Sequence, residues 1–543
     1  MISRLLARPW IAIAGLALAA SASGLGNGFV YDDVPIILQN PVIRHVESIG
    51  RIWGSAYWPA GLLYRPLTTQ LFAAEWAVGG GRRVVFHVVS VLLMMLVAVL
   101  FWRLARRILP AAPALAAAAF FAVHPVHAES VANVVGQAEL LATALTLFVI
   151  ERYLVWRERG PLVLGHRVAL AALTLAAIFS KETGYVIPPL LLAAEVFLVR
   201  RGDSWRSRFG ALGPVLLLQG AAVITAVLVR IIVLGPTPGA GPAVAIRDLA
   251  PARRIVGMLS VVPEWARLLV WPVHLQAEYG PPDLAVTAPF SLPHALGIAL
   301  LAAALALLMC AWRRAPVIAF GLAWVGLALF PVSNVLTTTG VILAERTLFL
   351  PSAGAMFVLG GLFAVWQPWL GRRGSMLRPV VLTLLGALVL AAVVRSSERQ
   401  LVWREQAGFI RRLETDAPTT YRAQLVASNY YSETGRYPPA ERAAANAYRL
   451  FKGDPQVFEQ YGQTLRAQGR CAEALPVLED GVRRFPDRTV ARSRLIECSL
   501  ATGDTTRALS VAGEGVRLGL SEFSGTLKRL GPYASRMRAP DPR

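Results

Sequence analysis

The sequence predicts an all-α protein in two parts, with about eleven membrane spans within residues 1–396 and a helical-repeat domain over 397–543. Hydrophobic residues make up 55% of the 543 residues and charged residues only 16%, and the mean hydropathy is +0.52. This composition is too apolar for a soluble chain of such length. The long apolar runs end near residue 396, and a regular pattern of small residues follows them.

That pattern is a repeat of 34 residues. Glycines recur at 435, 469 and 503, and each is followed five residues later by an alanine, at 440, 474 and 508. A 34-residue period is typical of tetratricopeptide (TPR) helix hairpins. Glycine permits the turn between two helices, and alanine lets them pack closely. The pattern therefore predicts a TPR α-solenoid, and segment 520–533 could cap it.

The spans are predicted from runs of apolar residues long enough to cross or nearly cross a bilayer. The basic N-terminus leads into the first run, which we interpret as a retained anchor rather than a cleaved signal peptide. Segment 257–275 contains Pro263, Glu264 and Arg267, so we expect it to be re-entrant or interfacial. The predicted spans are the apolar run that follows MISRLLARPW and ends near Leu25, and then about 84–102, 111–124, 134–151, 167–180, 184–199, 212–234, 294–312, 315–332, 351–370 and 379–395.

Arginine clusters between the spans predict the orientation. With eleven spans all of these clusters reach one face, which the positive-inside effect makes cytoplasmic. The same clustering explains the net charge of +21 without nucleic acid as a partner. The opposite face receives the first outer loop, 26–83, and everything after 396. The clusters are Arg4/Arg8, Arg103/Arg106/Arg107, Arg152/Arg157/Arg159, Arg200/Arg201/Arg206/Arg208, Arg313/Arg314 and Arg372/Arg373/Arg378.

The three cysteines provide no disulfide framework. Cys310 falls in an apolar span, whereas Cys471 and Cys498 fall in neighbouring repeats. A disulfide between the latter two is one alternative in an oxidising compartment. Two free cysteines in the repeat core are the interpretation we favour from sequence alone.

Polar residues gather in the outer segments and indicate where chemistry takes place. Asp32 and Asp33 follow the first span. A carboxylate there could take a proton from an attacking hydroxyl, with Asp33 the predicted general base and Asp32 orienting the acceptor or sharing the role. A solvated helix end is the simpler alternative for this pair. Trp53, Trp58 and Tyr64 could offer flat faces to a sugar or mark the membrane interface.

Other outer segments supply cations and histidines. Arg65, Lys181 and Arg346 could hold a phosphate, with Glu182 and Glu345 beside them, although ion pairs at Lys181–Glu182 and Glu345–Arg346 are as simple an interpretation. His124, His127, Glu129 and Glu139 could line the site. His124, His127 and Glu129 lack a further strong ligand, so no metal site is predicted from them. Phosphate-binding loops, GxSxG elbows and CxxC pairs are absent from the sequence.

In order along the chain, these segments resemble the transmembrane-and-TPR O-mannosyltransferase family, a group of polytopic GT-C glycosyltransferases. The most specific pieces are HPVHAESVANVVGQAELL (124–141) and LAERTLFLPS (343–352). Gln137 and Glu139 depart from the arginine and aspartate that the family usually shows, and Glu278 replaces a common aspartate, so mannose is not assumed as the sugar.

The resemblance implies a GT-C fold and transfer of a sugar from a polyprenyl-phosphate donor to a protein hydroxyl, with the TPR domain recruiting the acceptor. It places the catalytic acid in the first outer loop, at Asp32 and Asp33. No cofactor is certain, and a divalent metal is an open alternative. The Ala/Arg-rich composition suggests a bacterial inner-membrane protein with its active site and TPR domain in the periplasm.

Three other functions remain open at this stage. The membrane part could be an inactive anchor whose TPR domain scaffolds an envelope complex. The acceptor could be a lipid or glycan rather than a protein. A transporter of lipid-linked sugars is a further alternative, but the sequence shows no paired broken-helix repeats.

Overall fold

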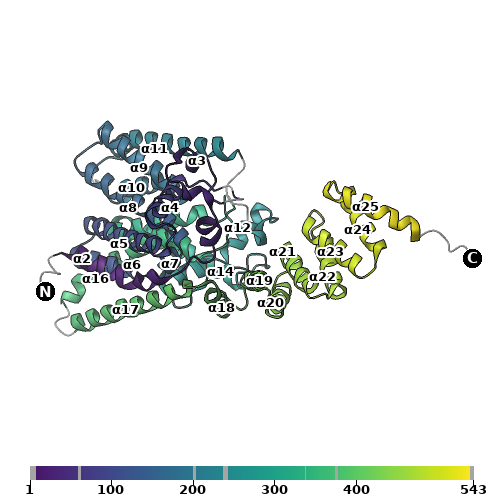
Figure 1. Ribbon diagram of the computed structural model, residues 1–543. Coiled ribbons are helices and arrows are strands. Elements are labelled where there is room, and N and C mark those ends of the chain that lie inside the picture. The colour runs from purple at the N-terminus through teal and green to yellow at the C-terminus, as the bar shows by residue number, and fades with distance from the viewer. Residues whose placement is uncertain are drawn as a thin grey trace, which may run out of the picture. The chain divides into compact units, whose positions relative to one another are not determined.

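The computed structural model describes residues 8–58, 61, 63–199, 203–236, 243–336, 338–372 and 377–537. In these ranges the regular elements are helices, with no β-strand, which confirms the predicted all-α class (Figure 1). The chain divides into two compact units, Met1–Ala277 with Ala288–Phe409, and Glu278–Thr287 with Ile410–Arg543. Arg4, Arg200, Arg201 and Arg373 of the predicted basic clusters lie outside the described residues.

The first unit contains the long apolar helices. Its helices and short helical turns are α2 (Pro9–Ser21), η1 (Ala22–Gly26), η2 (Val34–Leu38), η3 (Pro41–Arg44), α3 (Ile49–Trp53), α4 (Pro66–Gly79), α5 (Arg83–Ile108), α6 (Ala111–Ala122), η4 (Pro125–His127), α7 (Ala128–Ala132), η5 (Val134–Gly136), α8 (Gln137–Glu158), α9 (Leu164–Ser180), η6 (Glu182–Val186), α10 (Ile187–Phe197), α11 (Trp205–Leu234), η7 (Val244–Ile246), α12 (Pro251–Leu259), α13 (Val262–Val270), α14 (Leu292–Arg314), α15 (Pro316–Leu329), η8 (Phe330–Val332), η9 (Glu345–Leu348), α16 (Phe349–Arg372), α17 (Leu377–Gln400) and η10 (Leu401–Trp403). Helix α18 (Gln406–Asp416) begins in this unit and ends in the second.

By length and composition, seven helices of the described chain could cross a membrane. They are Pro9–Gly26, Arg83–Ile108, Val134–Glu158, Trp205–Leu234, Leu292–Arg314, Glu345–Trp369 and Pro379–Trp403.

The remaining predicted spans correspond to shorter or bent helices. The pair Ala111–Ala122 and Pro125–Ala132 makes an eighth candidate with a 43° bend, and Leu164–Ser180 and Pro316–Val332 are apolar but shorter. Helix α10 lies in the predicted span 184–199. The protein is thus a multi-pass membrane protein. The eleven-span count and the sidedness derived from it stay predictions.

Segment 257–275 folds as the end of α12, the helix α13 and the turn after it. Helices α12 and α13 have nine residues each. Nine helical residues rise only about 14 Å, less than half of a hydrocarbon core, so neither can cross. This agrees with the re-entrant or interfacial interpretation.

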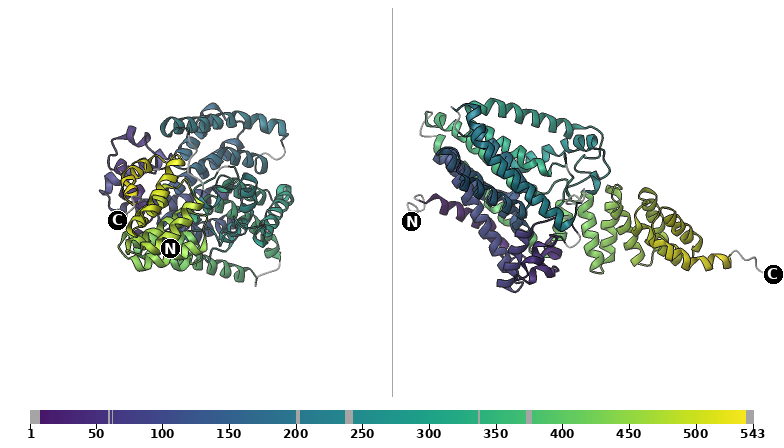
Figure 2. Two further views of the ribbon diagram at one scale, coloured as in Figure 1. Left: turned by 90° about the vertical axis from the view of Figure 1, so that its right-hand side faces the viewer. Right: turned by 90° about the horizontal axis from the view of Figure 1, so that it is seen from above.

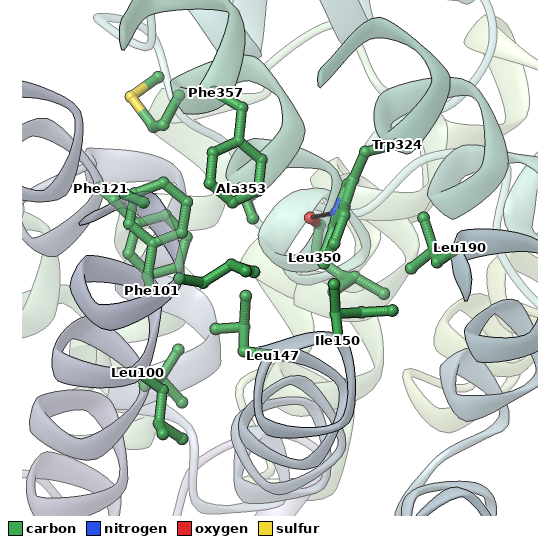
Figure 3. Packing of buried hydrophobic residues seen from close by; sticks show 14 of the residues in the cluster. Leu100, Phe101, Phe121, Leu147, Ile150, Leu190, Trp324, Leu350, Ala353 and Phe357 are labelled. Atoms are coloured by element: carbon green, nitrogen blue, oxygen red, sulfur yellow. Dashed lines mark hydrogen bonds between the residues drawn. The ribbon is translucent and has the colours of Figure 1, made fainter. Parts of the chain in front are cut away.

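The core of the first unit contains packed aromatic rings among its aliphatic side chains (Figure 3). Phe101 of α5 lies between Phe121 of α6, with ring centroids 4.4 Å apart, and Phe357 of α16 at 4.8 Å. Trp324 of α15 is fully buried, and its indole N–H donates to the Leu350 carbonyl at 2.9 Å. Pairing the polar edge of a buried tryptophan removes the cost of desolvating it. These contacts fix the helices whose ends carry the candidate site.

The second unit is a series of helix hairpins (Figure 2). Gly435, Gly469 and Gly503 adopt φ between +72° and +82° at the turns within the hairpins, which confirms their predicted role. The alanines at 440, 474 and 508 are fully buried. The arrangement is consistent with the predicted TPR-like solenoid. Its helices are α19 (Tyr421–Glu433), α20 (Tyr437–Leu450), α21 (Pro455–Ala467), α22 (Cys471–Arg484), α23 (Thr489–Ala501), α24 (Thr505–Arg517) and α25 (Glu522–Met537), the last covering the predicted cap.

A short strap, residues 278–287, belongs to the second unit although it lies between α13 and α14 in sequence. The Asp283 carboxylate accepts hydrogen bonds from Thr419 at 3.0 Å and Thr420 at 2.7 Å. Arg422 pairs with Glu278 at 3.2 Å. The strap is therefore attached to the first helix of the solenoid by both charge and hydrogen bonds.

Cys471 and Cys498 form a disulfide between neighbouring hairpins, with Cα atoms 4.9 Å apart. The expectation of two free cysteines is therefore wrong. The repeat spacing indicates that the start of α22 can approach the end of α23, but it does not show that the two sulfur atoms come within bonding distance. Cys310 is free and exposed on α14.

We expect the double variant Cys471→Ser/Cys498→Ser to destabilise the second unit by about 2–4 kcal/mol, because the bond closes a loop of the unfolded chain. Thermal unfolding, monitored by the proteolytic cleavage of the solenoid, measures the change. The Cys310→Ser variant is the matched control and should unfold like the wild type. An unfolding temperature in the double variant equal to that of the control would contradict the prediction.

Candidate active site

The two aspartates lie in the loop between η1 and η2, and they have different surroundings. The Asp33 side chain is 1% exposed. Its two carboxylate oxygens accept from the backbone N–H groups of Val134, at 3.1 Å, and Val135, at 2.9 Å. Asp32 is more accessible, and its carboxylate lies 3.7 Å from the Arg346 guanidinium. Asp33 therefore anchors the loop, whereas Asp32 faces the charged cluster.

The loop before Asp32 is held in an uncommon conformation. Tyr31 has φ +59°, a left-handed value that costs free energy for a residue with a side chain. Its backbone N–H donates to the Gln406 side chain at 2.9 Å, and its ring lies against Phe409. The N-terminal part of α18 thus sets the direction in which Asp32 points.

Glu129 and Arg346 join the two most specific sequence motifs. Arg346 donates through its backbone N–H to Glu129 at 2.8 Å and through its guanidinium to the same carboxylate. The Glu129 side chain is only 2% exposed. A buried bidentate contact of this kind is strong and directional. It holds the Arg346 guanidinium beside Asp32.

The remaining predicted cations come from other helix ends. The Lys181 ammonium group, at the end of α9, pairs with Glu139 at the start of α8. Arg65, just before α4, donates to Glu182 through Nε at 3.0 Å and Nη2 at 2.7 Å. The sequence neighbours Lys181–Glu182 and Glu345–Arg346 thus bond to other residues.

Arg65, Lys181 and Arg346 form one electrostatic cluster. Burial lowers the pKa of Lys181, and the charges of Arg65 and Arg346 lower it further, while Glu139 opposes them. The Arg65 guanidinium also lies over the Tyr57 ring at 4.7 Å. Three cations from distant parts of the chain are therefore within electrostatic reach of one another, and one of them, Arg346, contacts Asp32.

Two glycines allow these loops to fold so tightly. A Cβ at Gly136 would lie 2.2 Å from the Ser130 carbonyl oxygen, and one at Gly184 would lie 2.5 Å from the Ile178 nitrogen. Neither approach is possible for a residue with a side chain. Gly136 therefore permits the turn that offers Val134 and Val135 to Asp33, and Gly184 permits the turn after Lys181.

The structure places the other predicted residues outside this cluster. His124 bonds to the Leu269 carbonyl at 3.1 Å, and His127 to the Ser352 hydroxyl at 2.8 Å. The Tyr64 hydroxyl donates to the Trp53 carbonyl at 2.7 Å. These contacts explain the three residues as buried packing groups.

Glu345 accepts from the Gln276 backbone and lies 3.8 Å from Arg399. This carboxylate is therefore held by α17 and the turn after α13, and it makes no bond to Arg346. Within the described part of the chain, no group of three or more His, Cys, Asp or Glu residues could hold a metal ion.

Sequence reasoning missed Glu75 and Tyr57. Glu75, on α4, is 3% exposed, and burial raises its pKa to about 9, partly opposed by the Gln137 side chain. Its signal was a single acidic residue in the apolar run LFAAEWAV. Tyr57 carried no sequence signal, because aromatic residues are common in this loop.

Burial raises the pKa of Asp33 from 3.8 to about 8. In the unfolded chain Asp33 loses its proton near pH 4, whereas in the folded protein it keeps the proton until about pH 8. Its contribution to folding stability is therefore fully present below about pH 4 and is lost as the pH rises through 8. We therefore expect the unfolding temperature in detergent to fall between pH 4 and 8 more steeply for the wild type than for Asp33→Asn. Asp32→Asn should stay close to the wild-type slope, because burial is the largest cause of the raised Asp33 pKa and the charge of Asp32 is a lesser one. Equal slopes for the wild type and Asp33→Asn would contradict the assignment.

Comparison with known proteins identifies a matching family and several similar proteins. Residues 66–229 match the family described as dolichyl-phosphate-mannose-protein mannosyltransferase. The protein O-mannosyl-transferase Tmtc1 of Drosophila melanogaster is 26% identical over 78% of this chain and 59% of its own length. Tmtc2 of the same organism is 36% identical over 41% of this chain and 25% of its own length.

The human protein O-mannosyl-transferase TMTC4 is 26% identical over 80% of this chain and 65% of its own length. The chain thus spans less than two thirds of these curated relatives. The matches to Tmtc1 and TMTC4 extend over most of the chain, well beyond the matched family region. On this evidence the chain is similar to the TMTC and PMT protein O-mannosyl-transferases.

Proposed function

We propose that this protein is a membrane glycosyltransferase that moves a sugar from a polyprenyl-phosphate-linked donor to a serine or threonine hydroxyl of a protein. The observation that carries the proposal is the Asp32 carboxylate beside Arg346, which belongs to a cluster of three partly buried cations. The relatives named as protein O-mannosyl-transferases support the same reaction class. The sugar need not be mannose.

In this proposal Asp32 is the general base. It accepts the proton of the acceptor hydroxyl as the oxygen attacks the anomeric carbon. The bond from that carbon to the phosphate oxygen breaks, and the electron pair leaves with the phosphate. Asp33, the base expected from sequence, has both oxygens engaged by backbone N–H groups and acts as a positioning residue.

Arg346, Lys181 and Arg65 would stabilise the charge that develops on the leaving phosphate. Glu129, Glu139 and Glu182 hold these cations in place, so little reorganisation is needed when the charge appears. The N–H groups of these cations that do not bond to the carboxylates would be available to the phosphate oxygens.

We further propose that the solenoid recruits the protein acceptor and that both it and the active site face the periplasm of a bacterial inner membrane. The Cys471–Cys498 disulfide supports a non-cytoplasmic location, because such bonds persist in oxidising compartments. The arginine clusters support the same orientation through the positive-inside effect.

Intact-glycan mass spectrometry of envelope proteins tests the function. Wild-type, deletion and Asp32→Asn strains are compared at matched expression. We expect a hexose-like mass to be lost from the same serine or threonine peptides in the deletion and in Asp32→Asn. If a deletion phenotype is rescued by Asp32→Asn and no protein or lipid glycan changes, the non-catalytic scaffold is the correct function.

A further inference from the structure

A second polar site lies apart from the catalytic cluster, at the end of three membrane helices. It is a hollow of about 480 Å³ lined by Gly26, Arg83, Leu401, Arg404, Glu405 and Gly408. These residues come from the end of the α2–η1 span, the first residue of α5, and the segment from η10 into α18. The hollow therefore lies at one membrane boundary, the one that also bears the Asp32 loop.

Two arginines face this hollow without a partner. Arg83 and Arg404 are exposed, and neither guanidinium makes a hydrogen bond or ion pair with another described residue. With Glu405 the lining carries a net charge of +1. Two unpaired guanidinium groups so arranged offer the planar sets of donors that bind phosphate oxygens.

The backbone between the two arginines is fixed and lacks a side chain. The Gly28 N–H donates to the Arg404 carbonyl at 3.0 Å. A Cβ at Gly28 would lie 3.2 Å from that carbonyl oxygen and 3.8 Å from Arg83 Nη1. The absence of a side chain at Gly28 therefore lets this loop approach the Arg404 backbone closely, and Arg83 Nη1 lies at ordinary contact distance from the same point.

The helices that lead to the hollow present apolar side chains outward. On α5 the exposed residues Val84, Val88 and Leu92 recur every four residues and form one stripe. On α17 and η10, Leu390, Val394 and Leu401 are exposed. Helix α2 packs against both α5 and α17. An apolar surface thus leads along the spans to an arginine-lined hollow at the membrane boundary.

We propose that this hollow binds the phosphate of an anionic phospholipid in the leaflet on that side of the membrane. The arginines would contact the headgroup, while the acyl chains lie along α5 and α17. A phosphate group is the shared chemistry, and the apolar stripes make a lipid its source rather than free phosphate. This site takes no part in the chemical step of the proposed transfer reaction, and lipid binding there can be tested whether or not that reaction is correct.

Binding would also support the catalytic loop. The segment from η10 into α18, which lines the hollow, is flanked by the residues that hold loop 27–31 in place. Asn27 donates to the Gln400 carbonyl at 2.9 Å, and the Tyr31 N–H donates to the Gln406 side chain. A bound headgroup would neutralise Arg83 and Arg404 and so stabilise the packing of η10 and α18 on this loop.

The test uses the full-length protein in nanodiscs of phosphatidylcholine, with or without phosphatidylglycerol. We expect the wild type to bind phosphatidylglycerol about 10-fold more tightly than phosphatidylcholine, as native mass spectrometry of retained lipid measures it. Arg83→Gln/Arg404→Gln should lose most of this preference. The matched control, Arg51→Gln/Arg82→Gln, removes two exposed arginines of the first loop that do not line the hollow, and should keep it.

Two further arms make the result decisive. Arg83→Lys/Arg404→Lys preserves the charge and should retain a measurable preference for phosphatidylglycerol. Such a result would show that the loss in the glutamine variant is a loss of binding and not of folding. Inorganic phosphate is added to phosphatidylcholine nanodiscs as the free ion. Equal losses in the two glutamine variants, or thermal stabilisation by inorganic phosphate equal to that by phosphatidylglycerol, would overturn the proposal.

Discussion

Replacing Asp32 with asparagine is expected to lower the rate of sugar transfer by about 10²–10⁴-fold, because the variant cannot accept the proton of the attacking hydroxyl. Its stability should stay close to that of the wild type, since the Asp32 side chain is partly exposed and its contact with Arg346 is long, at 3.7 Å. Transfer to a peptide acceptor, measured with purified protein and a polyprenyl-phosphate sugar, gives the rate. Thermal unfolding of the same samples gives the stability.

Asp33→Asn is the contrasting variant. An asparagine oxygen can accept only one of the N–H groups of Val134 and Val135, and its amide nitrogen would face the other donor. Leaving a buried donor unsatisfied costs about 1–3 kcal/mol, so this variant should lose stability as well as activity. A stable, inactive Asp33→Asn together with an active Asp32→Asn would reverse the two roles and restore the base expected from sequence.

The sequence was sufficient to predict the secondary structure class because its periodicities are strong. The 34-residue spacing of Gly435, Gly469 and Gly503 corresponds to the observed turns, since only glycine is comfortable at their positive φ. Span lengths were harder to predict. The bend between α6 and η4 occurs where Pro125 interrupts the helix, and hydropathy alone does not report such a break.

The candidate site was predicted as a set of residues but not as a set of pairs. Asp32, Arg65, Lys181 and Arg346 do gather in one cluster. Their partners could not be predicted, because each cation bonds across the fold: Arg346 reaches Glu129, which lies 217 positions away in the sequence. The histidines were assigned to the site because they share a motif with Glu129, yet they point into the packing around Ser352 and Leu269.

The partner of Arg346 distinguishes a structural cation from a catalytic one. Arg346→Gln leaves Glu129, whose side chain is 2% exposed, without its cation, and breaking a buried pair in this way costs about 3–5 kcal/mol. The double variant Glu129→Gln/Arg346→Gln removes both charges and should recover most of that stability. Its transfer rate should remain low, because no guanidinium is left to stabilise the leaving phosphate.

Arg65→Gln is the matched control, since its partner Glu182 has a side chain that is 39% exposed. Water can solvate that carboxylate, so the loss of stability should be below about 1 kcal/mol. Unfolding temperatures and transfer rates of the four proteins, measured side by side, separate the two roles of Arg346. If the double variant regains activity along with stability, Arg346 serves only to neutralise Glu129, and the donor phosphate must be held by Lys181 and Arg65.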